Sequence, residues 1–327
     1  MRTYQKLFLA LLFVVVGSCS APSPQILPLK IAVLSTWPSF SVIFIAQDRG
    51  LFAKYGVSVL PVPVIEYMDW IKLYKENQVD GAYIGGLADT IALETEGFSP
   101  RFIYASDYSE TSDAIVGNPT LNSLSELKGE KVSFDGFNSF SHILVLKLLE
   151  KAGIHEGEFQ AANIPALKVL EALETGKIQA GHTYGHSVVD ALAKGYKILG
   201  VAGDIPHLVT EGLVVNANVI NTRSKDVQNM VKALVEAMDF LQHSPEEGLR
   251  IIAKHSHIPE TELASILKGV HVLNLKGNQE IFKQDGILCK GGKEIADFLH
   301  QKGVLLNAPD FNKIIDGQFI NAIGNEP

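Results

Sequence analysis

Short apolar runs alternate with amphipathic stretches along most of the chain. Residues 30–34 form an apolar run that predicts a buried strand, and residues 41–50 carry apolar side chains at helical spacing before a closing glycine. The order repeats, with strands expected over 57–64, 80–84 and 101–106 and helices over 67–76 and 85–96. Strands that alternate with helices are typical of parallel sheets flanked by helices, so the pattern predicts an α/β fold.

The alternation starts again in the middle of the chain. Strands are expected over 131–134, 158–162, 179–183 and 197–201, and helices over 139–152, 165–175 and 187–194. After an apolar run at 212–216 the pattern is helical over 225–243, 245–254, 259–267 and 293–302. Two α/β units followed by helices predict a first lobe, residues 30–115 and 217–327, with a second lobe, residues 116–216, inserted into it.

The first residues have the pattern of a targeting signal. Arg2 and Lys6 precede an apolar run over 7–16, and two small residues come just before Cys19. Ten apolar residues are too few to cross about 30 Å of hydrocarbon, so residues 1–18 are interpreted as a signal peptide. The segment resembles the lipobox of bacterial lipoproteins, which implies cleavage before Cys19 and acylation of this cysteine with chains such as palmitate. The alternative is an ordinary cleavage site at which Cys19 occurs by chance.

Cys19 and the residues after it predict how the mature protein is attached to the membrane. Residues 19–29 contain serine and proline and are expected to form a short tether. Two or more acyl chains give stable anchoring, so we expect a membrane-anchored lipoprotein of the cell envelope that faces the periplasm or the exterior. No later apolar run approaches about 18 residues, so the rest is expected to be soluble.

Composition excludes several classes of function. The 327 residues include 36 acidic and 28 basic ones, and loss of Arg2 and Lys6 with the signal changes the formal charge from −8 to −10. An acidic chain argues against nucleic acid as a partner. The only cysteines are Cys19 and Cys289, which excludes a disulfide scaffold and a cysteine-rich metal site and predicts no internal disulfide.

Four motifs occur in the order in which one family of proteins carries them. They are GLFAKYGV at 50–57, DYSETSDAIV at 107–116, LSELKGEKV at 124–132 and LEALETGKIQA at 170–180. With these motifs the chain resembles, over about residues 30–245, the solute-binding proteins of ATP-binding-cassette (ABC) importers. The group concerned is the nitrate/sulfonate/taurine type with its NMT1/THI5-like members, which also include binders of thiamine-pyrimidine precursors.

The resemblance implies an architecture and a mode of action. The family has the type 2 periplasmic-binding-protein fold, in which two α/β lobes are joined by two crossing strands and close around a solute by hinge motion. We place the crossings near residues 115–118 and 214–217. The implied partners are a small-molecule solute and the permease subunits of an ABC importer, and we expect a monomer that needs no cofactor.

Ligands in such folds lie beyond the carboxyl ends of strands, against the N-termini of helices. This rule gives a set of candidate ligand-binding residues, one group for each expected strand end: Thr36, Trp37 and Phe40; Gly85 and Gly86; Asp107 and Tyr108; Asn138 and Ser139; His182, Tyr184 and His186. The free amides of Gly85 and Gly86 could hold an anionic group. The set predicts a small polar organic solute, held by hydrogen bonds and by one or two aromatic faces.

Structural interpretations remain open for several of these residues. Trp37 and Phe40 could pack beneath their loop, Asp107 could bind backbone amides between the lobes, and Ser139 could act only as a helix cap. Asp113 is expected to support the hinge. The pair His182 and His186 could bind a metal, but no third ligand is evident and no metal is expected. Many relatives carry an aromatic-Glu-Pro sequence where this chain has Tyr184, Gly185 and His186, so a relative's substrate does not transfer directly.

Two other functions are conceivable for a chain with this resemblance. A metabolic enzyme for pyrimidine precursors shares the fold, but such enzymes carry a cysteine-rich iron motif that this chain lacks. The chain also lacks a Gly-x-Ser-x-Gly elbow, a His-Glu-x-x-His pair, a Walker loop and a Gly-x-Gly-x-x-Gly fingerprint, so we expect no enzymatic activity. The second alternative is a sensory module that presents its solute to a membrane receptor. The sequence does not distinguish this function from that of an importer subunit.

Overall fold

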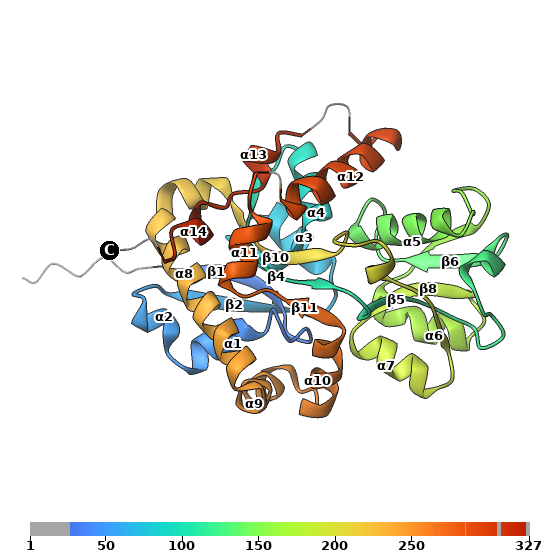
Figure 1. Cartoon of the computed structure of the whole chain (residues 1–327), viewed down its shortest axis with the longest axis horizontal. Coiled ribbons are helices and arrows are strands. Elements are labelled where there is room, and N and C mark those ends of the chain that lie inside the picture. Colours follow the sequence, from blue (N-terminus) through green and yellow to red (C-terminus); the bar gives the residue numbers. More distant parts are fainter. Residues whose placement is uncertain (1–26, 285, 306–308, 325–327) are drawn as a thin grey trace, which may run out of the picture.

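Two β-sheets organise the chain (Figure 1). The computed structural model describes residues 27–284, 286–305 and 309–324. The first sheet has six strands in the order β11-β4-β10-β3-β1-β2, and the second has five in the order β7-β6-β8-β5-β9. The strands of the first sheet are β1 (Leu29–Leu34), β2 (Val59–Val64), β3 (Gly81–Gly86), β4 (Pro100–Ser109), β10 (Thr210–Asn216) and β11 (Val270–Val272). Those of the second are β5 (Asp113–Gly117), β6 (Lys131–Phe134), β7 (Gln160–Asn163), β8 (Ala180–Tyr184) and β9 (Lys197–Val201).

Helices cover these sheets, and they follow the predicted alternation. Those before the second sheet are α1 (Val42–Asp48), α2 (Leu51–Lys54), α3 (Asp69–Lys75) and α4 (Leu87–Thr95). The second sheet carries α5 (Phe140–Lys151), α6 (Val169–Glu174) and α7 (His186–Ala193), with the short 3-10 turns η1 (Leu124–Leu127), η2 (Ala166–Lys168) and η3 (Ala202–Asp204). The C-terminal part adds α8 (Ala217–His243), α9 (Pro245–Ser256), α10 (Glu260–Lys268), α11 (Leu275–Ile281), α12 (Ile287–Gln301), α13 (Phe311–Ile314) and α14 (Gln318–Asn321). Within the described part of the chain, no helix is both long enough and apolar enough to cross a membrane.

The prediction of parallel sheets is wrong in one respect, because both sheets are mixed. Strand β10 runs antiparallel to β3 and β4, and β5 runs antiparallel to β8 and β9. The reason is that the chain leaves the first sheet along β4 and returns to it along β10, and it enters the second sheet along β5 and leaves it along β9, so the outgoing and returning strands of each sheet run in opposite directions. Pro61 and Pro63 lie in β2, which is an edge strand as expected.

The two segments in which the chain crosses from one sheet to the other differ from the predicted ones. It leaves the first sheet after Ser109 and joins the second at Asp113, and it returns between Val201 and Thr210. The expected crossings at 115–118 and 214–217 instead overlap strands β5 and β10. Both are buried apolar runs, and an apolar run alone does not tell to which sheet a strand belongs. We therefore propose lobe boundaries at 110–112 and 202–209.

The two passages lie side by side and are fixed to each other. The amide of Gly203 donates to the carbonyl of Glu110 (2.7 Å), and the amide of Ser109 donates to the carbonyl of Val209 (2.9 Å). The carbonyl of Gly269, between α10 and β11, accepts from three successive amides, those of residues 110–112, at 2.9–3.2 Å. The carbonyl oxygen of Gly269 thus fixes the start of the second lobe to the first lobe.

The expected tether ends inside the fold. Leu29, its last residue, is fully buried as the first residue of β1. Residues 19–26, which include the expected lipid-attachment residue Cys19, lie outside the described residues, as does the expected signal peptide.

The contact at Gly269 leads to a test of the hinge. A Cβ added there would lie 2.2 Å from Ser112 Oγ and 3.0 Å from the Ser112 amide nitrogen, so Gly269→Ala must displace the passage. We expect a loss of about 1–3 kcal/mol in the free energy of unfolding, measured by denaturant titration. The control is Gly291→Ala in α12, where the nearest atom lies at 3.5 Å and alanine favours the helix. Equal stability of the two variants would contradict a tightly packed hinge.

Candidate functional site

A small cavity lies between the two sheets, beside the passages. Its volume is about 10 Å³, close to what one water molecule needs. The first sheet and its connections supply Leu34, Trp37, Phe40, Tyr67 and Glu211, and the second supplies Asp113, Phe140 and Tyr184. Residues from both halves of the chain therefore line one cavity.

Aromatic rings make up most of the wall. Trp37 stacks on Phe40 with 6.0 Å between ring centroids and meets the edge of Tyr184 from the other sheet at 6.1 Å. Tyr67 and Phe140, again from opposite sides, form an edge-to-face pair at 4.7 Å. These pairs pack in geometries that aromatic rings favour, and they join the two halves across the cavity.

Buried carboxyl groups complete the wall. Asp113 and Glu211 line the cavity and are 1% and 4% exposed. Asp107 and Asp89 stand just behind the aromatic rings and are 0% and 2% exposed. No lysine or arginine is among the eight lining residues. Carboxylates are rarely buried without a basic partner, so this cluster needs a functional explanation.

Asp107 is held by the segment that follows β1. Its Oδ2 accepts from Trp37 Nε1 at 3.1 Å and from Ser39 Oγ, while Oδ1 is buried without a partner among the described residues. Burial raises the pKa of Asp107 to about 7, since these two hydrogen bonds offset only part of the loss of water and the charge of Asp113 adds to it. Asp107 therefore fixes Trp37 in the wall and responds to charge in the cavity.

Asp89 supports the opposite side of the wall. Its Oδ2 accepts from the Tyr67 hydroxyl at 2.6 Å, and the same tyrosine oxygen accepts from the amide of Gly86 at 3.1 Å. Burial raises the pKa of Asp89 to about 6, against hydrogen bonds from Tyr67 and from the backbone of Phe140. The amide of Gly86 is thus already paired within the protein, at the place where an anionic group was expected to bind.

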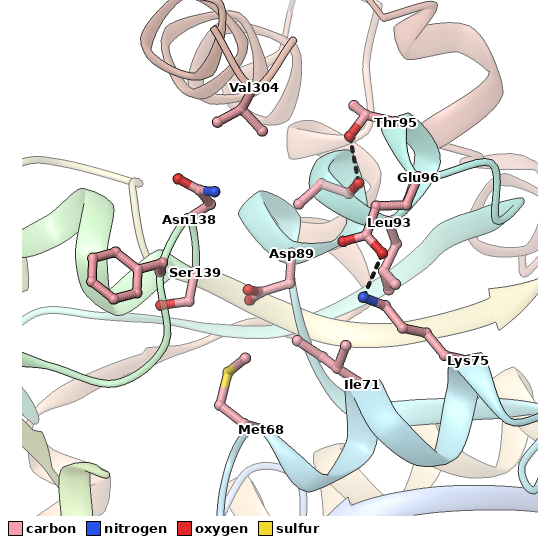
Figure 2. Close-up of a pocket in the computed structure, with 12 residues that line it drawn as sticks. Met68, Ile71, Lys75, Asp89, Leu93, Thr95, Glu96, Asn138, Ser139 and Val304 are labelled. Atoms are coloured by element: carbon pink, nitrogen blue, oxygen red, sulfur yellow. Dashed lines mark hydrogen bonds and ion pairs between the residues drawn. The ribbon is translucent and has the colours of Figure 1, made fainter. Parts of the chain in front are cut away.

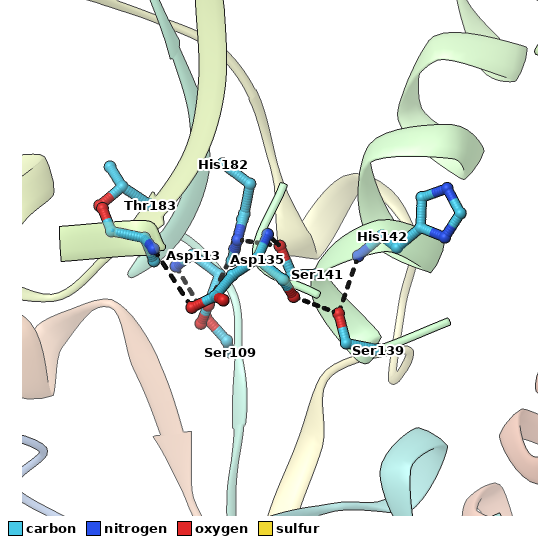
Figure 3. Close-up of polar contacts among 9 residues, drawn as sticks. Ser109, Asp113, Asp135, Ser139, Ser141, His142, His182 and Thr183 are labelled. Atoms are coloured by element: carbon cyan, nitrogen blue, oxygen red, sulfur yellow. Dashed lines mark hydrogen bonds and ion pairs between the residues drawn. The ribbon is translucent and has the colours of Figure 1, made fainter. Parts of the chain in front are cut away.

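Asp113 ends a chain of hydrogen bonds that runs through the second sheet (Figure 3). The amide of Asp135 donates to Ser141 Oγ (2.9 Å), and Ser141 Oγ lies 2.8 Å from His182 Nδ1. Since Ser141 accepts from an amide, we assign its proton to the bond with Nδ1, which leaves the His182 proton on Nε2. That nitrogen then donates to Asp113 Oδ1 at 3.2 Å. Asp113 Oδ2 is buried and has no partner among the described residues.

A larger hollow of about 300 Å³ adjoins Asp89 on its outer side (Figure 2). Asp89 and Met68 point into it from the first lobe, and Asn138 and Ser139 face them from the loop before α5. It is roomier than the inner cavity but holds fewer converging buried polar groups. The inner cavity is therefore the stronger candidate for a binding site.

The structure brings together part of the predicted set. Trp37, Phe40 and Tyr184 line the cavity, whereas Asp107 and His182 stand behind it as supports. The hydroxyl of Tyr184 is buried without a partner among the described residues. Gly85 and Gly86 allow close packing, since a Cβ on Gly85 would lie 2.4 Å from Val214 Cγ2.

Other predicted residues lie away from the cavity. Tyr108 packs against His207 and His271 on the outer side of the hinge, because β4 continues to Ser109 and neighbouring side chains of a strand point to opposite faces. Thr36 and His186 are half-buried and do not line it. Asn138 and Ser139 line the outer hollow, and Ser139 caps α5 by accepting from the amide of His142.

Sequence reasoning missed five lining residues. Tyr67 precedes α3, Phe140 begins α5, Leu34 ends β1, and Asp113 and Glu211 lie in strands. Only the two acidic residues gave a signal, since each is a carboxylate within a largely apolar strand. Among the described residues, no group of three histidine, cysteine or acidic side chains is arranged to hold a metal ion.

Comparison with solved structures places this fold among periplasmic binding proteins. The aliphatic sulphonate-binding protein SsuA of Escherichia coli matches with a TM-score of 0.69 and 17% identity over 88% of this chain and 96% of its own. The ligand-binding component of an ABC-type import system from Staphylococcus aureus matches with a TM-score of 0.73 and 15% identity over 90% and 97%. The desulfurization enzyme DszB also matches, with a TM-score of 0.66 and 11% identity over 90% and 98%. The two-lobed fold predicted from the motifs is confirmed.

Sequence comparison identifies the family. The model of the NMT1/THI5-like family matches residues 37–248, and the chain belongs to this family. A protein of Brucella abortus, provisionally named a binding protein, is 21% identical over 291 residues, which cover 82% of each chain. The predicted family is therefore confirmed.

The raised pKa of Asp107 predicts a dependence of stability on pH. The folded protein keeps this proton up to about pH 7, whereas an unfolded chain releases it near 3.8, so stability falls as the pH rises through this window. We expect Asp107→Asn to remove up to about 1.4 kcal/mol per pH unit from that slope. Denaturant titrations from pH 4 to 7 measure it.

The comparison between the two proteins removes the contributions of groups that do not interact with Asp107. His142, whose pKa is lowered to about 4 by burial, gives a slope of opposite sign below its ordinary pKa of 6.5. It is present in both proteins and cancels in the difference. Identical slopes for wild type and Asp107→Asn would show that Asp107 is ionised throughout.

Proposed function

We propose that the protein is a lipid-anchored, extracytoplasmic solute-binding protein that encloses a small polar organic solute between its lobes and delivers it to an ABC import permease. The observation that carries the proposal is that residues of both lobes line the same cavity. A solute held there contacts both lobes only when they are closed, so its binding free energy favours closure. The adjacent passages at 110–112 and 202–209 provide a hinge about which the lobes can move.

The relatives support this function rather than catalysis. Those named above include a sulphonate-binding protein and a component of an import system. The contacts Ser141–His182–Asp113 contain the residue types of a hydrolytic triad, and DszB shows that the fold also occurs in an enzyme. Ser141, however, is fully buried, does not line the cavity and receives an amide hydrogen bond. It serves to orient His182 rather than to attack a substrate.

Two tyrosines give a direct test of the binding site. Native mass spectrometry of the purified protein is expected to show one retained small molecule per chain. Tyr184→Ala, which opens the cavity wall, is expected to lower retention about tenfold or more. Tyr108→Ala, which removes an aromatic ring outside the cavity, is expected to retain the solute. Loss of solute in both variants or in neither would contradict the assigned site.

A separate experiment tests the anchor. Cells that express the wild-type protein are supplied with radiolabelled palmitate. We expect the protein to carry the label and to enter the detergent phase when the cell extract is separated into aqueous and detergent phases. Cys19→Ser removes the thiol that accepts the first lipid and is expected to abolish both. The conservative control is Cys289→Ser, which leaves the lipobox intact. Equal labelling of wild type and Cys19→Ser would contradict lipid anchoring.

A further inference from the structure

We propose that the solute is a small organic cation that carries N–H donors, such as a protonated amine or amidine, and that Asp113 and Glu211 bind its charged nitrogen. The proposal rests on the function above and specifies its ligand. Three observations lead to it: the wall of the cavity is rich in carboxyl groups, its unpaired polar atoms are mainly hydrogen-bond acceptors, and most of its other side chains are aromatic.

The charge around the cavity is of one sign. Asp113 and Glu211 line it, and Asp89 and Asp107 stand behind it, all four at least 96% buried. The basic side chain in contact with this group is His182, and its Nε2 is already hydrogen-bonded to Asp113 Oδ1. Like charges buried together repel each other strongly, and a cation placed among them offsets that repulsion.

The hydrogen bonds leave acceptors, not donors, for a ligand. Asp113 Oδ2 is buried without a partner among the described residues, because the bonds from Asp135 through Ser141 and His182 satisfy only the other oxygen. Glu211 has no side-chain hydrogen bond within the described part of the protein, and burial followed by the charges of Asp113, Asp107 and Asp89 raises its pKa well above its ordinary value, so it keeps a proton while the cavity is empty. A bound cation favours release of that proton to solvent, and Asp113 Oδ2 and the ionised Glu211 then both accept hydrogen bonds from the ligand.

The groups that could hold an anion are already in use. Trp37 Nε1 donates to Asp107, and the amide of Gly86 donates to Tyr67. Among the side chains that line the cavity, the hydroxyl of Tyr184 is the donor for which the described residues provide no partner, and a hydroxyl can accept as readily as it donates. A sulfonate, which is what the SsuA relatives bind according to their names, would meet carboxylates instead of donors.

The aromatic wall suits the same ligand. Trp37, Phe40, Tyr67, Phe140 and Tyr184 surround the acceptors. The faces of such rings carry partial negative charge and attract organic cations. A cavity of about 10 Å³ accepts an ammonium-sized group, so the rest of the solute must be accommodated by a wider opening of the lobes.

Two sets of matched probes test the charge directly. The first set is benzylammonium, benzyl alcohol and benzenesulfonate, and the second is propylammonium, propanol and propanesulfonate. Each set keeps one hydrocarbon body and changes the charge of its head. Near pH 7, we expect only the ammonium members to raise the melting temperature of the protein, and titration calorimetry to give one site per chain.

Variants assign the effect to the two carboxylates. Glu211→Gln and Asp113→Asn are expected to weaken ammonium binding about tenfold or more, since each removes a charge-assisted hydrogen bond. Without probe, Glu211→Gln is expected to melt at an equal or higher temperature than wild type, because a buried carboxyl group is replaced by an amide of similar size that cannot ionise. That result would separate loss of binding from loss of folding. Glu96→Gln, in the outer hollow, is the control and should bind as wild type does.

Each opposite outcome overturns the assignment. Stabilisation by the sulfonates and not by the ammonium ions would show an anion site, and it would leave the solute-binding function standing. No shift with either ammonium ion, or unchanged binding in both variants, would also refute the cation site. The mass spectrum of the purified protein then decides separately on the function, because a retained neutral or anionic solute would support it and the absence of any solute would count against it.

Discussion

The burial of acidic side chains between two lobes is the constraint on which this site depends. Asp89, Asp107, Asp113 and Glu211 lie within one region from which water is nearly excluded. A carboxylate loses much of its hydration there, so each must be protonated, hydrogen-bonded or matched by a cation. The described residues provide hydrogen bonds to Asp89 and Asp107 but none to Asp113 Oδ2 or to the Glu211 carboxyl group. In the proposed function, a solute with hydrogen-bond donors supplies the partners that these two groups lack.

The hinge converts that local energy into a change of shape. The two passages between the sheets are bonded to each other and, through the carbonyl of Gly269, to the first lobe. A solute bound to one lobe gains its remaining contacts only when the other closes, so its affinity for the closed form sets the position of the equilibrium. In the proposed function, a permease at the membrane then distinguishes loaded from empty protein by the shape of the closed form. The aromatic pairs across the cavity stabilise closure, and the repulsion among carboxylates opposes it.

The sequence predicted the elements and the family better than the site. Hydrophobic periodicity reports local structure, and it located most strands and helices, but it does not report which sheet a strand joins, so the crossings were misplaced. Trp37, Phe40 and Tyr184 were predicted because ligands lie beyond the carboxyl ends of strands. Tyr108 was misplaced because β4 is longer than its apolar run and its alternation extends to Ser109. Glu211 could not be found in this way, since its contacts depend on the return of the chain through residues 202–209.

A crystal structure of the protein with the solute retained from its cells tests the central claim most directly. The account predicts density for one small molecule between the lobes, with a nitrogen within hydrogen-bond distance of Asp113 Oδ2 and of the Glu211 carboxylate, and with its body against Trp37 and Tyr184. Density for the solute at another place, or a negatively charged group directed at these two carboxylates, would contradict it.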